Sequence, residues 1–220
     1  MTGDPIRLVL VDDQELVRVG FRLILERAGF AVVGEAADGL EAVTVARQTT
    51  PDVVLMDVRM PRLDGIEATR RIVAANPTTR VLALTTFDLD RYVYAAVSAG
   101  ASGFLLKDVP PDDLAHAVRV VARGEAMLAP ILTRRLLERF TSSPPPGHLP
   151  PPLRVLPERD IDILRLVARG LSNAEIGSEL HLSVSTVKTY VSRLLTHLDV
   201  RDRLQLAVLA YESGLVTPGA

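Results

Sequence analysis

The first 122 residues alternate between two patterns of apolar and polar positions. Short and almost continuous apolar runs predict strands, whereas apolar residues at helical spacing predict helices. The predicted strands lie at residues 6–11, 31–35, 52–56, 80–84 and 103–106, and the helices at 14–28, 40–48, 65–74, 91–98 and 112–122. Because the strands are apolar on both faces and alternate with helices, we expect an α/β fold with a doubly wound, five-stranded parallel sheet.

The pattern changes after residue 123. Pro130–Phe140 is compatible with a short helix, but the prolines between Pro144 and Pro152 cannot continue a helix or a central strand. We predict a semi-extended linker here, and an ordered surface loop is the alternative. The expected organisation is a first domain at 1–123, a linker at 124–155 that is partly helical and then proline-rich, and a second domain at 156–220.

The second domain shows helical spacing with clear start and stop signals. Gly170 is placed to end the first helix in the left-handed conformation, and Ser172-Asn-Ala-Glu175 is a capping box that opens the second. Ser183 and Asp202 are N-cap residues for two more helices. These signals predict a small all-α domain of four helices, at about 159–169, 173–180, 183–198 and 202–213.

The composition restricts the chemistry. Of the 220 residues, 48% are apolar and 24% charged, which suits a packed core. The chain has no cysteine, which excludes disulfides, thiolate zinc sites and thiol catalysis. The N-terminus lacks the pattern of a signal peptide, and the charge-free run at 92–106 is too short to span a membrane. We therefore expect a soluble, cytoplasmic protein with no membrane partner.

Five polar residues stand at the ends of predicted strands: Asp12, Asp13, Asp57, Thr85 and Lys107. Parallel strands end at one edge of a sheet, where ligands bind in such folds, so we expect these side chains to converge. Three carboxylates repel one another unless a cation neutralises them, and an all-oxygen set suits Mg²⁺. A carboxylate can also be the nucleophile that forms an acyl phosphate.

Each of these residues alone has a simpler interpretation. Asp12 and Asp13 could cap the following helix, and Asp57 could be an ordinary loop acid. Lys107 could be a solvated surface lysine, although it is one of only two lysines in the chain. The constellation carries more information than any of its members.

Four motifs carry this further: Val11-Asp-Asp13, Leu55-Met-Asp57-Val-Arg-Met-Pro61, Leu84-Thr85 and Ala99-Gly-Ala-Ser-Gly-Phe-Leu-Leu-Lys107. In order and spacing, across residues 6–122, they resemble the motif set of response-regulator receiver domains. The resemblance implies a flavodoxin-like fold in which Asp57 accepts a phosphoryl group from a sensor histidine kinase. It also implies that Thr85 and Lys107 contact that group, that Phe104 is the switch residue, and that the Mg²⁺ ligands are Asp12, Asp13, Asp57 and the backbone carbonyl of Arg59.

The third helix of the second domain has an acid-free polar face. Its apolar stripe is Val187, Val191, Leu194 and Leu198, and its polar face is Ser185, Lys188, Thr189, Ser192 and Thr196. Short hydroxyl side chains beside a lysine suit a helix that enters the major groove of DNA. An ordinary solvated helix face is the alternative.

Three more motifs lie in this domain: Leu156-Pro-Glu-Arg-Asp160, Leu166-Val-Ala-Arg-Gly-Leu-Ser-Asn-Ala-Glu-Ile176 and Leu182-Ser-Val-Ser-Thr-Val-Lys-Thr189. They resemble the LuxR-type helix-turn-helix, and the whole chain resembles NarL/FixJ-family response regulators. The resemblance implies double-stranded DNA as a partner, with base edges facing Lys188, Thr189 and Ser192, and phosphates held by Ser183, Thr186, Tyr190 and Arg193. Gly177 stands where that family often has alanine, and we expect it to weaken its helix by up to about 1 kcal/mol.

The last predicted helix has two apolar faces, one with Leu204 and Val208 and the other with Leu206 and Leu209. This favours a homodimer contact, and extra burial within one chain is the alternative.

The sequence thus predicts a phosphorylation-controlled transcription regulator that is not an enzyme. A DNA-binding regulator that ignores phosphorylation is one alternative. A Mg²⁺-dependent phosphatase with Asp57 as nucleophile is another, but Arg59 occupies the position where such enzymes need a second acid.

Overall fold

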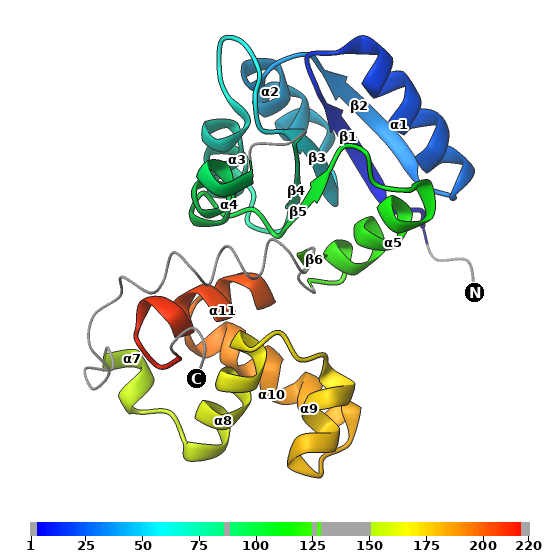
Figure 1. Ribbon diagram of the computed structural model, residues 1–220. Coiled ribbons are helices and arrows are strands. Elements are labelled where there is room, and N and C mark those ends of the chain that lie inside the picture. Colours follow the sequence, from blue (N-terminus) through cyan, green and yellow to red (C-terminus); the bar gives the residue numbers. More distant parts are fainter. Residues whose placement is uncertain (1–3, 86–88, 125–126, 129–150, 217–220) are drawn as a thin grey trace. The chain divides into compact units, whose positions relative to one another are not determined.

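The computed structural model describes residues 4–85, 89–124, 127–128 and 151–216 (Figure 1). The chain divides into two compact units, Met1–Leu132 and Thr133–Ala220, which are described separately here. The helix predicted at 130–140 and most of the proline-rich segment lie outside the described residues. No helix within the described ranges is long and apolar enough to cross a membrane.

The first unit contains the predicted parallel sheet. Five of its strands follow the prediction closely: β1 (Arg7–Val11), β2 (Ala31–Ala36), β3 (Val53–Asp57), β4 (Arg80–Thr85) and β5 (Gly103–Leu106). The two-residue strand β6 (Met127–Leu128) pairs with β5 and extends the sheet to the order β2-β1-β3-β4-β5-β6. The expectation of a doubly wound parallel sheet is confirmed, and β6 is an addition inside the segment interpreted as a linker.

The helices cover both faces of this sheet: α1 (Glu15–Arg27), α2 (Gly39–Thr49), α3 (Gly65–Ala75), α4 (Leu89–Ser98) and α5 (Pro111–Ala122). Alternate residues of a strand point to opposite faces, so β1 contributes to two cores. Leu8 and Leu10 pack with residues of α1 and α5, whereas Val9 and Val11 pack with residues of α2 and α3. In Figure 1, α1 and α5 lie on one side of the sheet and α2, α3 and α4 on the other.

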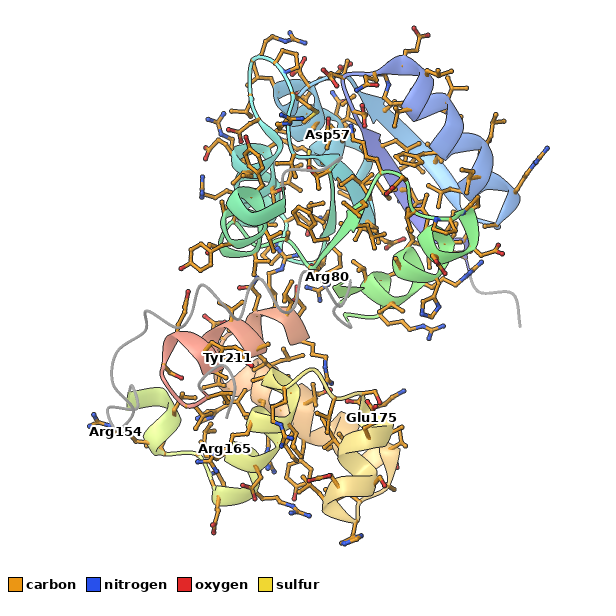
Figure 2. All side chains as sticks on the ribbon, in the orientation of Figure 1. Asp57, Arg80, Arg154, Arg165, Glu175 and Tyr211 are labelled. Carbon is orange, nitrogen blue, oxygen red and sulfur yellow. The ribbon has the colours of Figure 1, made fainter. Side chains whose placement is uncertain are left out.

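All the strands run in parallel, so their carboxyl ends meet at one edge of the sheet. Figure 2 shows Asp57 at this edge and Arg80, the first residue of β4, near the opposite one. The turn after β3 is tight, because a Cβ atom on Gly65 would collide with the backbone carbonyl of Asp57. Glycine at this position lets α3 begin directly against the end of β3.

The second unit contains the four predicted helices, preceded by a short helix α7 (Pro151–Arg154). They are α8 (Glu158–Ala168), α9 (Asn173–Leu180), α10 (Val184–His197) and α11 (Arg203–Glu212). Gly170 has φ +84°, and Ser172 with Glu175 forms the predicted capping box. Ser183 and Asp202 accept hydrogen bonds from the first turns of α10 and α11. The expected helical domain is confirmed.

Gly177 of α9 has a geometric role that the sequence did not reveal. A Cβ atom there would lie 2.7 Å from the carbonyl oxygen of Leu182, whereas the weakening of α9 expected from low helix propensity stays a prediction. The Leu182 N–H also donates to the Gly177 carbonyl over 2.8 Å. Only glycine allows the turn after α9 to approach the helix this closely, so its low helix propensity is offset by the turn that it permits.

Candidate functional site

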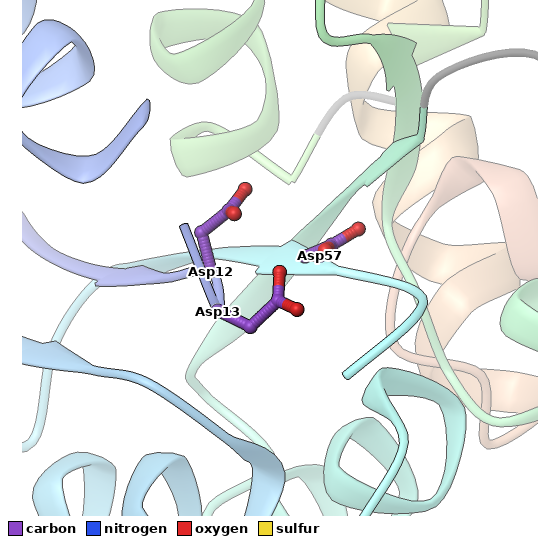
Figure 3. A group of neighbouring side chains, drawn as sticks. All are labelled: Asp12, Asp13 and Asp57. Atoms are coloured by element: carbon purple, nitrogen blue, oxygen red, sulfur yellow. The ribbon is translucent and has the colours of Figure 1, made fainter. Parts of the chain in front are cut away.

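Three carboxylates from the ends of two strands lie together at the carboxyl edge of the sheet (Figure 3). One oxygen from each of Asp12, Asp13 and Asp57 lies within 4.8 Å of the others. Asp12 and Asp57 are buried, whereas Asp13 is exposed. A cleft of about 490 Å³ opens beside them, lined by Asp13, Gln14, Asp57, Arg59, Met60, Pro61, Thr85 and Lys107. The predicted convergence of strand ends is present in the structure.

Lys107 neutralises part of this charge. Its Nζ atom lies 2.7 Å from Oδ2 of Asp12 and 2.9 Å from Oδ2 of Asp57. The position follows from the sheet, because Lys107 comes directly after β5 and its N–H donates to the carbonyl of Thr85 over 2.8 Å. A single ammonium therefore bridges two buried carboxylates, and it is not the solvated surface lysine of the simpler interpretation.

Burial and ion pairing shift the pKa values of Asp57 and Lys107. Burial raises the pKa of the Asp57 carboxyl above its ordinary value, and the hydrogen bond from Lys107 opposes that rise without cancelling it. Burial alone would lower the pKa of Lys107, but its hydrogen bonds to Asp12 and Asp57 raise it above its ordinary value. Lys107 therefore stays charged at neutral pH, while Asp57 carries its negative charge at a cost in stability.

The turn between β1 and α1 holds Asp12 from several sides. Oδ1 of Asp12 accepts the N–H of Gln14 over 3.0 Å, and its backbone carbonyl accepts from Nη1 of Arg18 over 2.7 Å. Helix α1 has Gln14 as its N-cap residue and has no side-chain cap. Asp12 thus stabilises the turn before α1, and the next residue, Asp13, lines the cleft. Arg18 was not recognised from the sequence, where it looks like any helical arginine.

The loop between β3 and α3 forms one side of the cleft. The Arg59 N–H donates to Oδ1 of Asp57 over 3.3 Å, and the Gly65 N–H donates to the carbonyl of Val58 over 3.0 Å. Arg62 forms an ion pair with the buried Asp38, which caps α2. No pattern in the sequence indicates that Asp38 and this loop meet.

The residues present suit Mg²⁺. Three carboxylates supply oxygen ligands close together, and the adjoining cleft has room for the waters that Mg²⁺ retains. Neither a cysteine nor a histidine is among the residues that line the cleft, which disfavours softer metals. Asp12, Asp13 and Asp57 are therefore the side chains that would hold the ion.

Thr85 and Phe104 lie on neighbouring strands. In the parallel register Ala83 pairs with Phe104 and Thr85 pairs with Leu106, so Thr85 and Phe104 share one face of the sheet. Thr85 lines the cleft, whereas the Phe104 ring is fully buried. The two residues are therefore diagonal neighbours on that face, two positions apart in the register.

The polar face of α10 is the second cluster of candidate residues. Ser183, the N-cap of this helix, exchanges hydroxyl hydrogen bonds with Ser185 and Thr186 over 2.8 and 2.7 Å. Lys188 and Thr189 are exposed. A shallow cleft of about 420 Å³ lies beside this face, lined by Ser185, Thr186, Thr189, Tyr190 and Arg193. Val187, Val191 and Leu194 form the buried stripe as predicted, whereas Leu198, the fourth predicted member, is the C-cap residue and only half-buried.

Arg193 has two partners that the sequence did not reveal. Its guanidinium forms an ion pair with the buried Asp160 of α8 and stacks over the Tyr190 ring at 4.6 Å from the ring centroid. Ser192 precedes Arg193, and its backbone carbonyl accepts a hydrogen bond from the hydroxyl of Thr196, one turn further on, over 3.1 Å. Arg193 therefore ties α10 to α8 while its side chain remains half exposed.

Both units match known families. The model described as response regulator receiver domain matches residues 8–119, and the model described as bacterial regulatory proteins, luxR family, matches residues 154–210. Together the two matches span both structural units.

Relatives and solved structures match almost the whole chain. The transcriptional regulatory protein YxjL of Bacillus subtilis (strain 168) is 42% identical over 217 residues, which cover 98% of this chain and 100% of the relative. The transcriptional regulatory protein LiaR of the same organism is 41% identical over 212 residues, covering 96% and 99%. The crystal structure of the response regulator ChrA of a heme-sensing two-component system has 36% identity and a TM-score of 0.53, and covers 97% of this chain and 100% of that chain.

Proposed function

This chain belongs to the response regulators that join a receiver domain to a LuxR-type DNA-binding domain, and from that premise we propose how it works. Asp57 accepts a phosphoryl group from a sensor histidine kinase. The C-terminal unit responds by binding specific DNA sequences and regulating transcription. The observation that carries the proposal is the Asp57 carboxylate, which lies beside a cleft with Lys107 at 2.9 Å and two further acids close by.

In the proposed transfer, a carboxylate oxygen of Asp57 attacks the phosphorus atom of a phosphohistidine. A P–O bond forms as the P–N bond breaks, and the imidazole leaves with the electron pair of that bond. Lys107 offsets negative charge on the phosphoryl oxygens, and the Thr85 hydroxyl donates a hydrogen bond to one of them. Asp12, Asp13, Asp57 and the Arg59 carbonyl would hold Mg²⁺, which would supply further positive charge to offset the phosphoryl group.

The acyl phosphate changes the local charge and so drives the switch. The acyl phosphate carries a charge of roughly −2 where the carboxylate carried −1, and its phosphoryl oxygens attract the Thr85 hydroxyl. Phe104 shares a face of the sheet with Thr85, so the packing beside its ring changes when Thr85 moves. Two packed states that differ modestly in free energy are sufficient for such a response.

In the second unit, α10 is the proposed recognition helix. Lys188, Thr189 and Ser192 contact base edges, because they lie on a polar face that carries no acid. The contacts to phosphates come from Ser183, Thr186, Tyr190 and Arg193, which fix the register of the helix on the duplex. We propose that the protein acts in the cytoplasm and binds DNA as a homodimer on paired half-sites.

Phosphate-affinity gels test the central step. The wild-type protein, incubated with an active cognate kinase, ATP and Mg²⁺, should give a shifted band that Asp57→Asn does not give. Asp108→Asn, an exposed acid next to Lys107, is the matched control and should shift like the wild type. Absence of a shifted wild-type band would refute the proposal.

The alternatives predict different results. A regulator that ignores phosphorylation would bind DNA equally well before and after treatment with acetyl phosphate and Mg²⁺. A phosphatase would release phosphate repeatedly from external esters. The side chain at position 59 argues against turnover, since an arginine instead of a second acid borders the Asp57 cleft.

A further inference from the structure

The loop between β3 and α3 borders the pocket, so its conformation affects every group there. Arg59, Met60 and Pro61 line the cleft beside Asp57. The loop is fixed at its end by Gly65, whose N–H donates to the Val58 carbonyl over 3.0 Å. Between these points lies Arg62, which has no hydrogen bond to the pocket in the structure.

Arg62 has a backbone conformation that arginine rarely adopts. Its φ angle is +65°, in the left-handed region that favours glycine and asparagine. Such a residue persists when its surroundings over-determine it. The neighbouring contact is the ion pair between the Arg62 guanidinium and Oδ2 of Asp38.

Asp38 is placed to hold the loop. Its side chain is 1% exposed, whereas that of Arg62 is 64% exposed, so the acid is the fixed member of the pair. Oδ1 of Asp38 accepts the N–H groups of Leu40 and Glu41 over 2.8 and 3.1 Å, which anchors the carboxylate at the start of α2. The next residue, Gly39, donates its N–H to the Leu63 carbonyl over 3.1 Å.

The N-cap of α2 does not by itself require a charge. Asparagine caps helices about as well as aspartate, and one oxygen of Asp38 already serves that purpose. The second oxygen faces the guanidinium of Arg62, and the charge of a buried carboxylate needs such a partner. The start of α2 thus holds two successive residues of the loop, Arg62 and Leu63.

We propose that Asp38 is a positioning residue of the acidic pocket: through Arg62 it holds the β3–α3 loop so that the Arg59 backbone carbonyl faces the carboxylates. The inference rests on the proposed function, in which that carbonyl is a Mg²⁺ ligand. Asp38 itself touches neither the ion nor the phosphoryl group. It acts on the pocket from a different loop, at the start of α2.

The test measures Mg²⁺ binding by the full-length chain, with Mg²⁺ alone as the probe, by titration of amide resonances in NMR spectra. Asp38→Asn keeps the helix cap and removes the charge. Arg62→Asn also removes the ion pair, and asparagine tolerates positive φ. We expect each variant to bind Mg²⁺ about fivefold more weakly than the wild type, because a loosened loop must be ordered before its carbonyl can serve as a ligand.

The double variant separates this proposal from a merely structural role. If the ion pair is the cause, Asp38→Asn with Arg62→Asn should be about fivefold weaker, like each single variant, and not about 25-fold. Arg70→Gln is the matched control, because it breaks an exposed ion pair with Glu67 on α3 that lies outside the cleft. It should bind Mg²⁺ like the wild type.

The outcomes are distinguishable. Mg²⁺ affinities within twofold of the wild type in both single variants would overturn the positioning role, as would losses that multiply in the double variant. Circular dichroism melts show whether Asp38→Asn is folded. If Asp38→Asn does not fold, the Mg²⁺ affinity of Arg62→Asn tests the same ion pair. A wild-type protein that neither binds Mg²⁺ nor accepts a phosphoryl group overturns the proposed function itself.

Discussion

The acidic pocket and the polar face of α10 use similar side chains in opposite ways. In the pocket, two carboxylates are buried and share one ammonium at distances below 3 Å. On α10, hydroxyl groups bond to one another or to the backbone of the same helix, and Lys188 is exposed to solvent. The pocket gathers residues from the ends of four strands, β1, β3, β4 and β5, whereas the face is built from one continuous helix.

This difference determines how each region tolerates change. Buried charges are strongly coupled, because removing one partner leaves another uncompensated at low dielectric. Exposed groups on a helix act nearly independently, since solvent screens them from one another. We therefore expect single substitutions to abolish the function of the pocket and only to weaken that of the helix face.

Lys107→Met should have the largest effect. The ammonium bridges Asp12 and Asp57, so its removal leaves two buried carboxylates without their counter-charge and the phosphoryl oxygens without a donor. We expect phosphorylation to slow by about 100-fold or more, as when one electrostatic contact to a transition state is lost. Kinase-dependent phosphorylation rates measure this, and DNA binding of the unphosphorylated protein should not change. A rate within tenfold of the wild type would contradict the role given to Lys107.

Substitutions at Gly65 and Gly20 compare the stability cost of an added methyl group at a tightly packed and at an open position. Gly65→Ala places a Cβ atom against the Asp57 carbonyl and should destabilise the protein by about 1–3 kcal/mol. Gly20→Ala lies on α1 with no atom within 4 Å of the new Cβ and should stabilise it by about 0.5–1 kcal/mol. Urea denaturation of both variants gives the two values. Equal stabilities would show that the turn after β3 can relax.

Lys188→Met is the counterpart of the first variant on the helix face. Loss of one exposed contact to a base should cost about 1–3 kcal/mol of DNA affinity and relax specificity at one position. Phosphorylation should be unchanged. Gel-shift titrations with a selected operator and with its single-base variants measure both effects, and uniform weakening across all sequences would make Lys188 a phosphate contact instead.

Asp57→Asn should have the smallest effect, a change in the free energy of unfolding in the absence of metal. The sign of this change shows whether burial or the Lys107 pair dominates the energetics of Asp57. The pKa of Asp57 is raised, so the folded state binds this proton more tightly than the unfolded state does. Stability therefore falls as the pH rises above the ordinary value of 3.8. At pH 7 in EDTA, the neutral variant should be more stable by about 1 kcal/mol, and the difference should close below pH 3.8.

Thermal melts over this pH range check the prediction, with and without Mg²⁺. The ion should raise the melting temperature of the wild type and leave that of Asp57→Asn nearly unchanged. A variant that is less stable than the wild type at pH 7 in EDTA would mean that the Lys107 pair outweighs the burial of Asp57.

The sequence was sufficient for the sheet and for the four C-terminal helices, because apolar periodicity and capping residues are local signals. Asp57 and Lys107 could be brought together since strand ends meet in any parallel sheet. Contacts between separate loops have no such signal. The Asp38–Arg62 pair and the Asp160–Arg193 pair join residues of no recognisable spacing, so they required the structure.

Two other features were hidden for a different reason. Gly177 has low helix propensity, and propensity alone does not reveal the carbonyl of Leu182 against which it packs. Strand β6 has two residues and pairs only because β5 presents a free edge. A strand of two residues is too short to leave a periodic pattern in the sequence.

The two lysines of the chain fall one in each region, Lys107 in the pocket and Lys188 on α10. Amine-reactive labelling followed by peptide mass spectrometry therefore yields one reporter for each unit. Lys188 is exposed and should acylate readily, with protection on adding DNA, whereas Lys107 is 10% exposed and paired with two acids, which should keep it largely unlabelled. Because each unit has a single lysine, the labelling of the native chain reports separately on the accessibility of the pocket and on DNA binding by α10.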